Sequence, residues 1–123
     1  MTTNIAVTVT PRSKTGNDVD CDITGAQVVN NALWLPQGDD YDVTFNLVPN
    51  AGIGVTGWAP SPFANNTGKC PRAAGLNPPC SGFKLDPAGN PVINVDGRGG
   101  RAVVHYRLDF NARGTFDPII IIG

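Results

Sequence analysis

The sequence predicts an all-β protein with almost no helix, folded as an antiparallel two-sheet sandwich of seven or eight strands. Straight-chain helix formers are nearly missing, since all ten acidic residues are Asp, Lys occurs three times and Met once. Residues with branched β-carbons, which suit a pleated surface, are common, at 12 Val, 8 Ile and 10 Thr. Short segments of alternating polarity recur between turn residues, which is typical of a sandwich.

The size and charge of the chain limit its class. At 123 residues there is room for one domain, 1–123. Hydrophobic residues make up 41% and charged residues 15%, which is typical of a folded chain. The net charge of −1 leaves no basic surface, so we expect neither nucleic acid nor a membrane as partner.

No targeting segment is visible at the start of the chain. The longest apolar run, 119–122, is far too short to cross a bilayer. We therefore expect a soluble protein without a signal peptide, cytoplasmic by default.

Alternation places the strands in order along the chain. The clearest is 41–47, in which apolar residues alternate with Asp, Thr and Asn, and the longest is 102–110. Pro11 is expected to end the first strand. The other predicted strands are 5–9, 19–23, 26–29, 83–85, 93–95 and 116–122, and 33–35 is a short apolar piece. Glycine-rich residues 96–100 join two of them and predict a hairpin turn rather than a nucleotide site.

Every second residue of each strand should face inward, and these side chains together should form a single core. Burying each is worth roughly 1.5–3 kcal/mol. The predicted core consists of Ile5, Val7, Val9, Val43, Phe45, Leu47, Ile93, Val95, Val104, Tyr106, Leu108 and Phe110.

A long Pro/Gly-rich loop at about 49–82 interrupts the pattern, and a loop of this length is usually functional or mobile. Cys70 and Cys80 lie within it, and a disulfide between them would constrain a segment that lacks core contacts. The missing signal peptide argues against such a bond. Cys21 lies on a strand and should be a small buried side chain, and the three cysteines do not match a zinc site.

Trp58 in the same loop, with Asn65 and Asn66, has the chemistry of a sugar-binding platform, in which a ring stacks and amides donate hydrogen bonds. The alternative, which we favour, is that Trp58 anchors the loop to the core. Asn65-Asn66-Thr67 also fits a glycosylation sequon in a eukaryotic secretory setting.

Two acidic clusters could in principle hold calcium. Asp18, Asp20 and Asp22 share one strand face, and the second cluster lies in a turn. The second cluster consists of Asp39, Asp40 and Asp42. A solvated face is the preferred interpretation, because the glycine and distal Glu of the helix-loop-helix motif are missing. We expect no metal and no cofactor.

The sequence shows no recognisable set of catalytic residues. His105 is the only histidine, and none of the three serines lies in a G-x-S-x-G turn. A solvated His105 on an outer strand face is the preferred interpretation, so no enzyme is expected.

The final run of isoleucines cannot alternate between core and solvent. Either the strand is buried on both faces, or its outer face meets another subunit. Ile120 and Ile122 are the predicted interface residues.

The closing Asp117-Pro118-Ile119-Ile120, preceded by the 41–47 strand, the long loop and the 102–110 strand, resembles small bacterial proteins of the AidA/PixA inclusion-body kind and the related DP-EP family. The resemblance covers roughly the last 85 residues, and the Cys-bearing loop departs from it. It implies an immunoglobulin-like sandwich with no assigned catalysis, and it assigns no functional residues.

Two functions follow as hypotheses. The first is a non-enzymatic domain that acts by self-association, as a homo-oligomer, or by binding a protein partner. The second is a module that binds a carbohydrate or small molecule through the long loop around Trp58, with a glycan as the partner.

Overall fold

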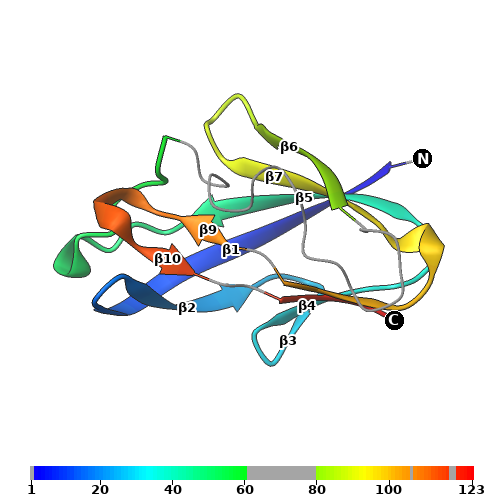
Figure 1. Ribbon diagram of the computed structural model, residues 1–123, viewed down its shortest axis with the longest axis horizontal. Helices are drawn as coiled ribbons and strands as arrows, with labels where there is room; N and C mark the ends of the chain where they lie inside the picture. Colours follow the sequence, from blue (N-terminus) through cyan, green and yellow to red (C-terminus); the bar gives the residue numbers. More distant parts are fainter. Residues whose placement is uncertain (1, 61–79, 106, 117–118) are drawn as a thin grey trace.

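The computed structural model describes residues 2–60, 80–105, 107–116 and 119–123, and within them it confirms the all-β class. Figure 1 shows the strands of two sheets running along the long axis of the molecule. No α-helix is found in this part of the chain, and three short 3-10 turns are its only helical segments: η1 (Ala51–Ile53), η3 (Gly97–Gly99) and η4 (Asn111–Arg113). No helix among these residues is long and apolar enough to cross a membrane.

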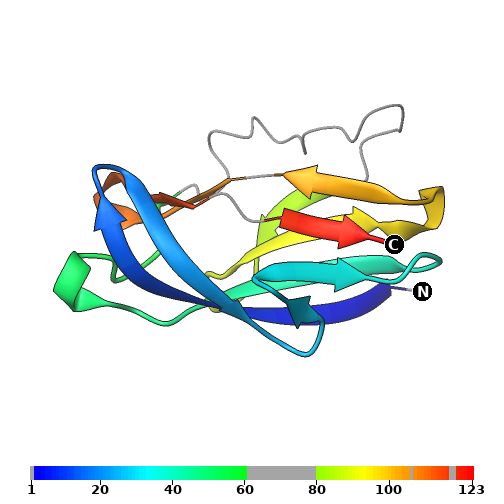
Figure 2. The ribbon, with the colours of Figure 1, turned by 90° about the horizontal axis from the view of Figure 1, so that it is seen from below.

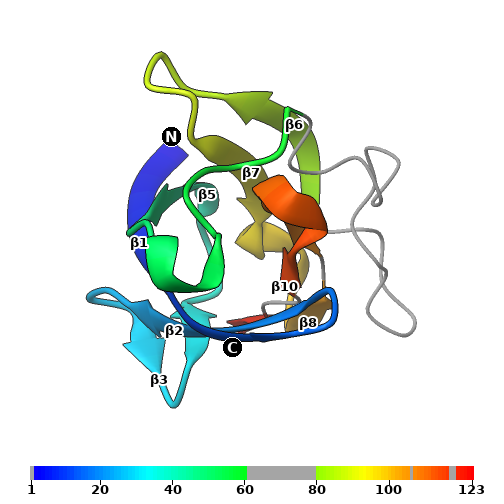
Figure 3. The same ribbon diagram turned by 90° about the vertical axis from the view of Figure 1, so that its left-hand side faces the viewer.

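The larger sheet has seven strands in the order β6-β7-β5-β1-β2-β10-β9. Figure 3, which looks along the long axis, shows that this sheet curls around the core. Its members are β1 (Thr2–Thr15), β2 (Asp18–Thr24), β5 (Asp40–Leu47), β6 (Cys80–Leu85), β7 (Pro91–Asp96), β9 (Leu108–Asp109) and β10 (Thr115–Phe116).

The smaller sheet has four strands in the order β3-β4-β11-β8. Figure 2 looks onto its outer face. Its members are β3 (Val28–Val29), β4 (Ala32–Leu35), β8 (Ala102–His105) and β11 (Ile119–Ile122).

Both sheets are mixed, whereas the sequence predicted antiparallel ones. Strand β1 runs parallel to β5, β10 parallel to β2, and β11 parallel to β4. Each parallel pair joins strands that are not consecutive in the chain. Alternation reports which face of a strand is buried but not which strand lies beside it, so it could not reveal these pairs.

Strand β1 continues through Pro11 to Thr15 instead of ending there. The register against β2 shifts between Pro11 and Ser13, which marks a bulge. A bulge accommodates a residue without a backbone N–H. Pairing with β5 already ends at Val9, so Pro11 interrupts one ladder rather than two.

The two longest predicted segments of the second half each divide between the sheets. Segment 102–110 becomes β8 in the small sheet and β9 in the large one, and segment 116–122 becomes β10 and β11. The partners are kept across the change, because β8 pairs with β11 and β9 pairs with β10. Strand β8 is thus an edge strand of the small sheet and β9 an edge strand of the large sheet, and each pairs with a strand of segment 116–122.

The glycine-rich turn at 96–100 is likewise not a hairpin, because it leads from β7 in the large sheet to β8 in the small one. The Gly97 N–H donates to the Asp39 carbonyl at 2.8 Å, and the Gly97 carbonyl accepts from Gly38 N–H at 3.0 Å. A β-carbon on Gly97 would lie 2.9 Å from the Asp39 carbonyl oxygen. The crossover therefore needs glycine for close backbone approach.

One hydrophobic cluster is shared by both sheets. Of the predicted core, eight side chains are buried: Val7, Val9, Val43, Phe45, Ile93, Val95, Leu108 and Phe110. Ile5 and Leu47 pack against the cluster while partly exposed. The side chains of Val104 and Tyr106 lie outside the described part. Further members include Leu33, Leu35, Tyr41, Ile120 and Ile122.

Candidate functional site

The outer face of the small sheet is apolar throughout the side chains that are described. Trp34 on β4, Ile121 on β11 and Val103 on β8 lie side by side in one row across three strands. Trp34 is 45% exposed and Val103 43%. We call this surface the outer face, made of Val29, Ala32, Trp34, Val103, Ile119 and Ile121.

The four isoleucines of β11 alternate between the core and this outer face. Ile120 and Ile122 are buried, at 0% and 1% exposure, while Ile119 and Ile121 are partly exposed. The predicted interface residues thus pack inside their own chain, and a subunit contact through β11 would use Ile119 and Ile121. Because β11 lies between β4 and β8, both of its backbone edges are paired, and only its face is open to a partner.

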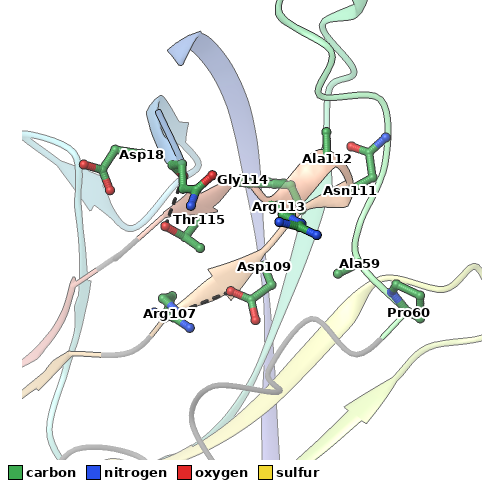
Figure 4. Close-up of a pocket in the computed structure, with 12 residues that line it drawn as sticks. Asp18, Ala59, Pro60, Arg107, Asp109, Asn111, Ala112, Arg113, Gly114 and Thr115 are labelled. Carbon is green, nitrogen blue, oxygen red and sulfur yellow. Dashed lines mark hydrogen bonds and ion pairs between the residues drawn. The ribbon is translucent and has the colours of Figure 1, made fainter. Parts of the chain in front are cut away.

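A pocket of about 660 Å³, lined by both polar and apolar groups, opens at one end of the molecule. It lies at the end that faces the viewer in Figure 3, where the turns after β1, β5 and β9 gather. Figure 4 shows its lining. The lining residues are Asn17, Asp18, Ala59, Pro60, Arg107, Asp109, Phe110, Asn111, Ala112, Arg113, Gly114 and Thr115.

An ion pair lies on one wall of the pocket. Arg107 Nε is 3.2 Å from Asp109 Oδ1, and Asp109 is 8% exposed. Arg107 directly precedes β9 and lies two positions before Asp109, so the two side chains project to the same side of the extended chain. The loop segment that contains Ala59 is bound to β9 through a backbone hydrogen bond, in which the Ala59 N–H donates to the Asp109 carbonyl at 3.0 Å.

The turn that follows β9 holds two ordinary residues in the left-handed region. Ala112 has φ 57° and Arg113 has φ 59°. A hairpin turn with two positive φ values normally uses Asn or Gly, as the β3–β4 turn does with Asn30 and Asn31. Left-handed backbone costs a residue with a β-carbon roughly 1–2 kcal/mol.

Asn111 fixes this turn against the loop before the pocket. Its Oδ1 accepts hydrogen bonds from Thr56 N–H at 3.1 Å and Gly57 N–H at 3.3 Å. Its Nδ2 donates to Thr56 Oγ1 at 2.8 Å. The surrounding contacts therefore impose the strained backbone, and the Arg113 side chain is presented to the pocket as a result.

Trp58 lies directly before the pocket residues Ala59 and Pro60 and packs against the core. Its ring stacks on Phe110, with centroids 5.1 Å apart, and its Nε1 donates to Asn90 Oδ1 at 3.4 Å. This is the anchoring role that we favoured. Asn65 and Asn66 lie outside the described residues, so the sugar platform stays a prediction.

The cysteines are placed in part. Cys21 is buried, as expected, with a free thiol. Its burial, followed by the charges of Asp20 and Asp22, raises its pKa to about 12. Cys80 begins β6, but Cys70 lies outside the described residues, so their disulfide stays a prediction.

The two acidic clusters do not meet. Asp22 lies opposite Thr10 of β1 and Asp42 opposite Asn4, so the clusters are offset by six residues along β1, roughly 20 Å. The second cluster has its own partner, because Asn94 Nδ2 donates to Asp40 at 2.9 Å and to Asp42 at 3.0 Å. Within the described part no group of three metal-ligating side chains forms a site.

His105 lies in β8 opposite Ile119, and its side chain is outside the described part. The pocket and Arg113 were not predicted. Their parts come from separate turns, and Ala-Arg is not a turn signature, so no local pattern could have revealed them. No protein family and no curated protein matches the chain.

Proposed function

We propose that this chain is a non-enzymatic β-sandwich that acts through self-association, with the outer face of the small sheet packed against the same face of a second copy. The observation that carries the proposal is the row of Trp34, Ile121 and Val103, which offers apolar side chains of three adjacent strands to solvent. Contiguous apolar surface of this kind marks interaction sites.

A second copy fits this face better than a charged partner. The six residues of the outer face carry no charge, so they offer nothing to select a partner of opposite sign. An apolar patch is complementary to itself, which is what a two-fold contact requires. The net charge of −1 gives two copies little mutual repulsion.

The sandwich and its immunoglobulin-like character belong to the same proposal. A single core shared by the two sheets supports a sandwich. The likeness to AidA/PixA and DP-EP proteins rests on the closing Asp117-Pro118-Ile119-Ile120 and the order of segments, and it agrees with a role that needs no catalytic group.

Sedimentation velocity tests the association over a concentration series. We expect a dimer for the unchanged chain, and a dissociation constant at least about tenfold larger for Trp34→Ser combined with Val103→Thr. Matched controls are Leu85→Ser and Val48→Thr, because these residues are 50% and 45% exposed but lie outside the small sheet.

A strict monomer at about millimolar concentration would contradict self-association. Equal weakening by the control variants would show that the contact lies elsewhere. If the unchanged chain stays monomeric but binds a different protein through Trp34 and Val103, the outer face serves a heterologous partner instead.

A further inference from the structure

We propose that the pocket at this end of the molecule binds a small hydroxylated monocarboxylate of the size of a sugar acid, with the guanidinium of Arg113 holding the carboxylate. This site lies on the turns after β1, β5 and β9, apart from the small sheet, so it is independent of the association proposed above. A volume of about 660 Å³ lies within the range of small-molecule sites.

Arg113 supplies the charge that the ligand must match. Its guanidinium has no hydrogen-bond or ion-pair partner in the described part of the chain, whereas Arg107, the other arginine of the lining, is paired with Asp109. A guanidinium presents two parallel N–H donors that fit the two oxygens of a carboxylate. The Arg113 side chain is exposed, so its guanidinium is open to a ligand from solvent.

The other charges of the lining favour a single negative charge on the ligand. Asp18 and Asp109 contribute two carboxylates to the lining, and their charges repel a doubly charged phosphate more than a singly charged carboxylate. In Figure 4 the Asp18 carboxylate points away from Arg113, while Asp109 is held by its ion pair with Arg107. A monocarboxylate can therefore reach Arg113 with less repulsion than a dianion.

The remaining lining suits a hydroxylated body with one apolar side. The exposed amide of Asn17 adds hydrogen-bond donors and an acceptor to the lining, and these groups can recognise hydroxyl groups. Ala59, Pro60 and Ala112 add an apolar surface opposite polar groups, as small-molecule sites do. A sugar ring has both kinds of surface.

Isothermal titration of the full chain with D-glucuronate tests the proposal, with D-glucose as the neutral match and inorganic phosphate as the dianion. We expect binding of glucuronate, and affinities for glucose and phosphate at least about tenfold weaker. Arg113→Gln should weaken glucuronate binding by about tenfold or more. Arg101→Gln, at an exposed arginine outside the pocket, should leave it unchanged.

Every other result overturns the proposal. Equal affinities for glucose and glucuronate would show that the carboxylate is not recognised. Tighter binding of phosphate than of glucuronate would show that the site does not prefer a single negative charge. Undiminished binding by Arg113→Gln moves the site elsewhere, and no heat with glucuronate at about 10 mM rejects the ligand class. Arg113→Lys keeps a positive charge at this position, so stronger glucuronate binding by Arg113→Lys than by Arg113→Gln, with an unchanged circular dichroism spectrum for both variants, separates loss of charge from loss of structure.

Discussion

Trp58 stacks on Phe110 with the two rings 5.1 Å apart and inclined by 13°, and this contact joins the loop after β5 to the turn after β9. A backbone bridge between the same two residues reinforces it. Phe110 is 1% exposed, so Trp58 extends the core outward at the end that holds the pocket.

Trp58→Ala should lower the free energy of unfolding by about 3 kcal/mol, because it removes the stacked ring and leaves a cavity beside Phe110. Chemical denaturation followed by circular dichroism measures it. Trp34→Ala is the matched control, and its loss should stay below about 1 kcal/mol since Trp34 is 45% exposed. Equal losses for the two variants would mean that the stack contributes nothing beyond ordinary surface contact.

Gly97→Ala should destabilise the chain by about 1–3 kcal/mol through overpacking. The added β-carbon would meet the Asp39 carbonyl oxygen at 2.9 Å and Tyr41 Cε2 at 3.1 Å. Gly99 lies in the same turn with nothing within 4 Å of its would-be β-carbon, so Gly99→Ala should be nearly neutral. Thermal melts of the two variants make the comparison, and a neutral Gly97→Ala would show that the crossover tolerates a wider spacing.

Ala112→Gly should raise the unfolding free energy by about 1 kcal/mol, because glycine adopts the left-handed region without a steric penalty. Ala51 has no positive φ, so Ala51→Gly should give no gain and should lower stability slightly. Urea titration of both variants is the measurement. A loss of stability at position 112 would argue against strain in this turn.

The Cys21 thiol should make stability fall at high pH. Its pKa is near 9.0 in an exposed environment and about 12 in the folded chain. Because the folded pKa is the higher one, the thiol's contribution to stability is complete below about pH 9 and is lost as the pH rises towards 12. The variant Cys21→Val should lack this part of the pH dependence in denaturation experiments.

Alkylation gives a second measurement of the same thiol. Iodoacetamide should modify Cys21 in the native chain far more slowly than in denaturant, because burial keeps the thiol protonated. Peptide mapping isolates Cys21 from Cys70 and Cys80, and the same map under non-reducing conditions tests their predicted disulfide. Fast modification of native Cys21 would contradict its burial.

The sequence by itself determined the class of structure and correctly assigned eight predicted core side chains to the interior. Alternation assigns Val43 and Phe45 to the core because a pleated strand turns every second side chain to the same face, and this needs no knowledge of neighbours. For the four isoleucines in a row it predicted cover on both faces, whereas the structure buries Ile120 and Ile122 and leaves Ile119 and Ile121 partly exposed. Choosing between core and partner required the sheet order, which places β11 between β4 and β8.

Only the tertiary structure decided which strands are neighbours, which sheet each of β8, β9, β10 and β11 joins, and which side chains meet at the pocket. The physical reason is that periodicity is a local property, whereas strand pairing and the approach of Arg113 to Ala59 depend on contacts between segments far apart in the chain. The left-handed backbone of Ala112 belongs to this second group, because the hydrogen bonds of Asn111 to Thr56 and Gly57 impose it against local preference.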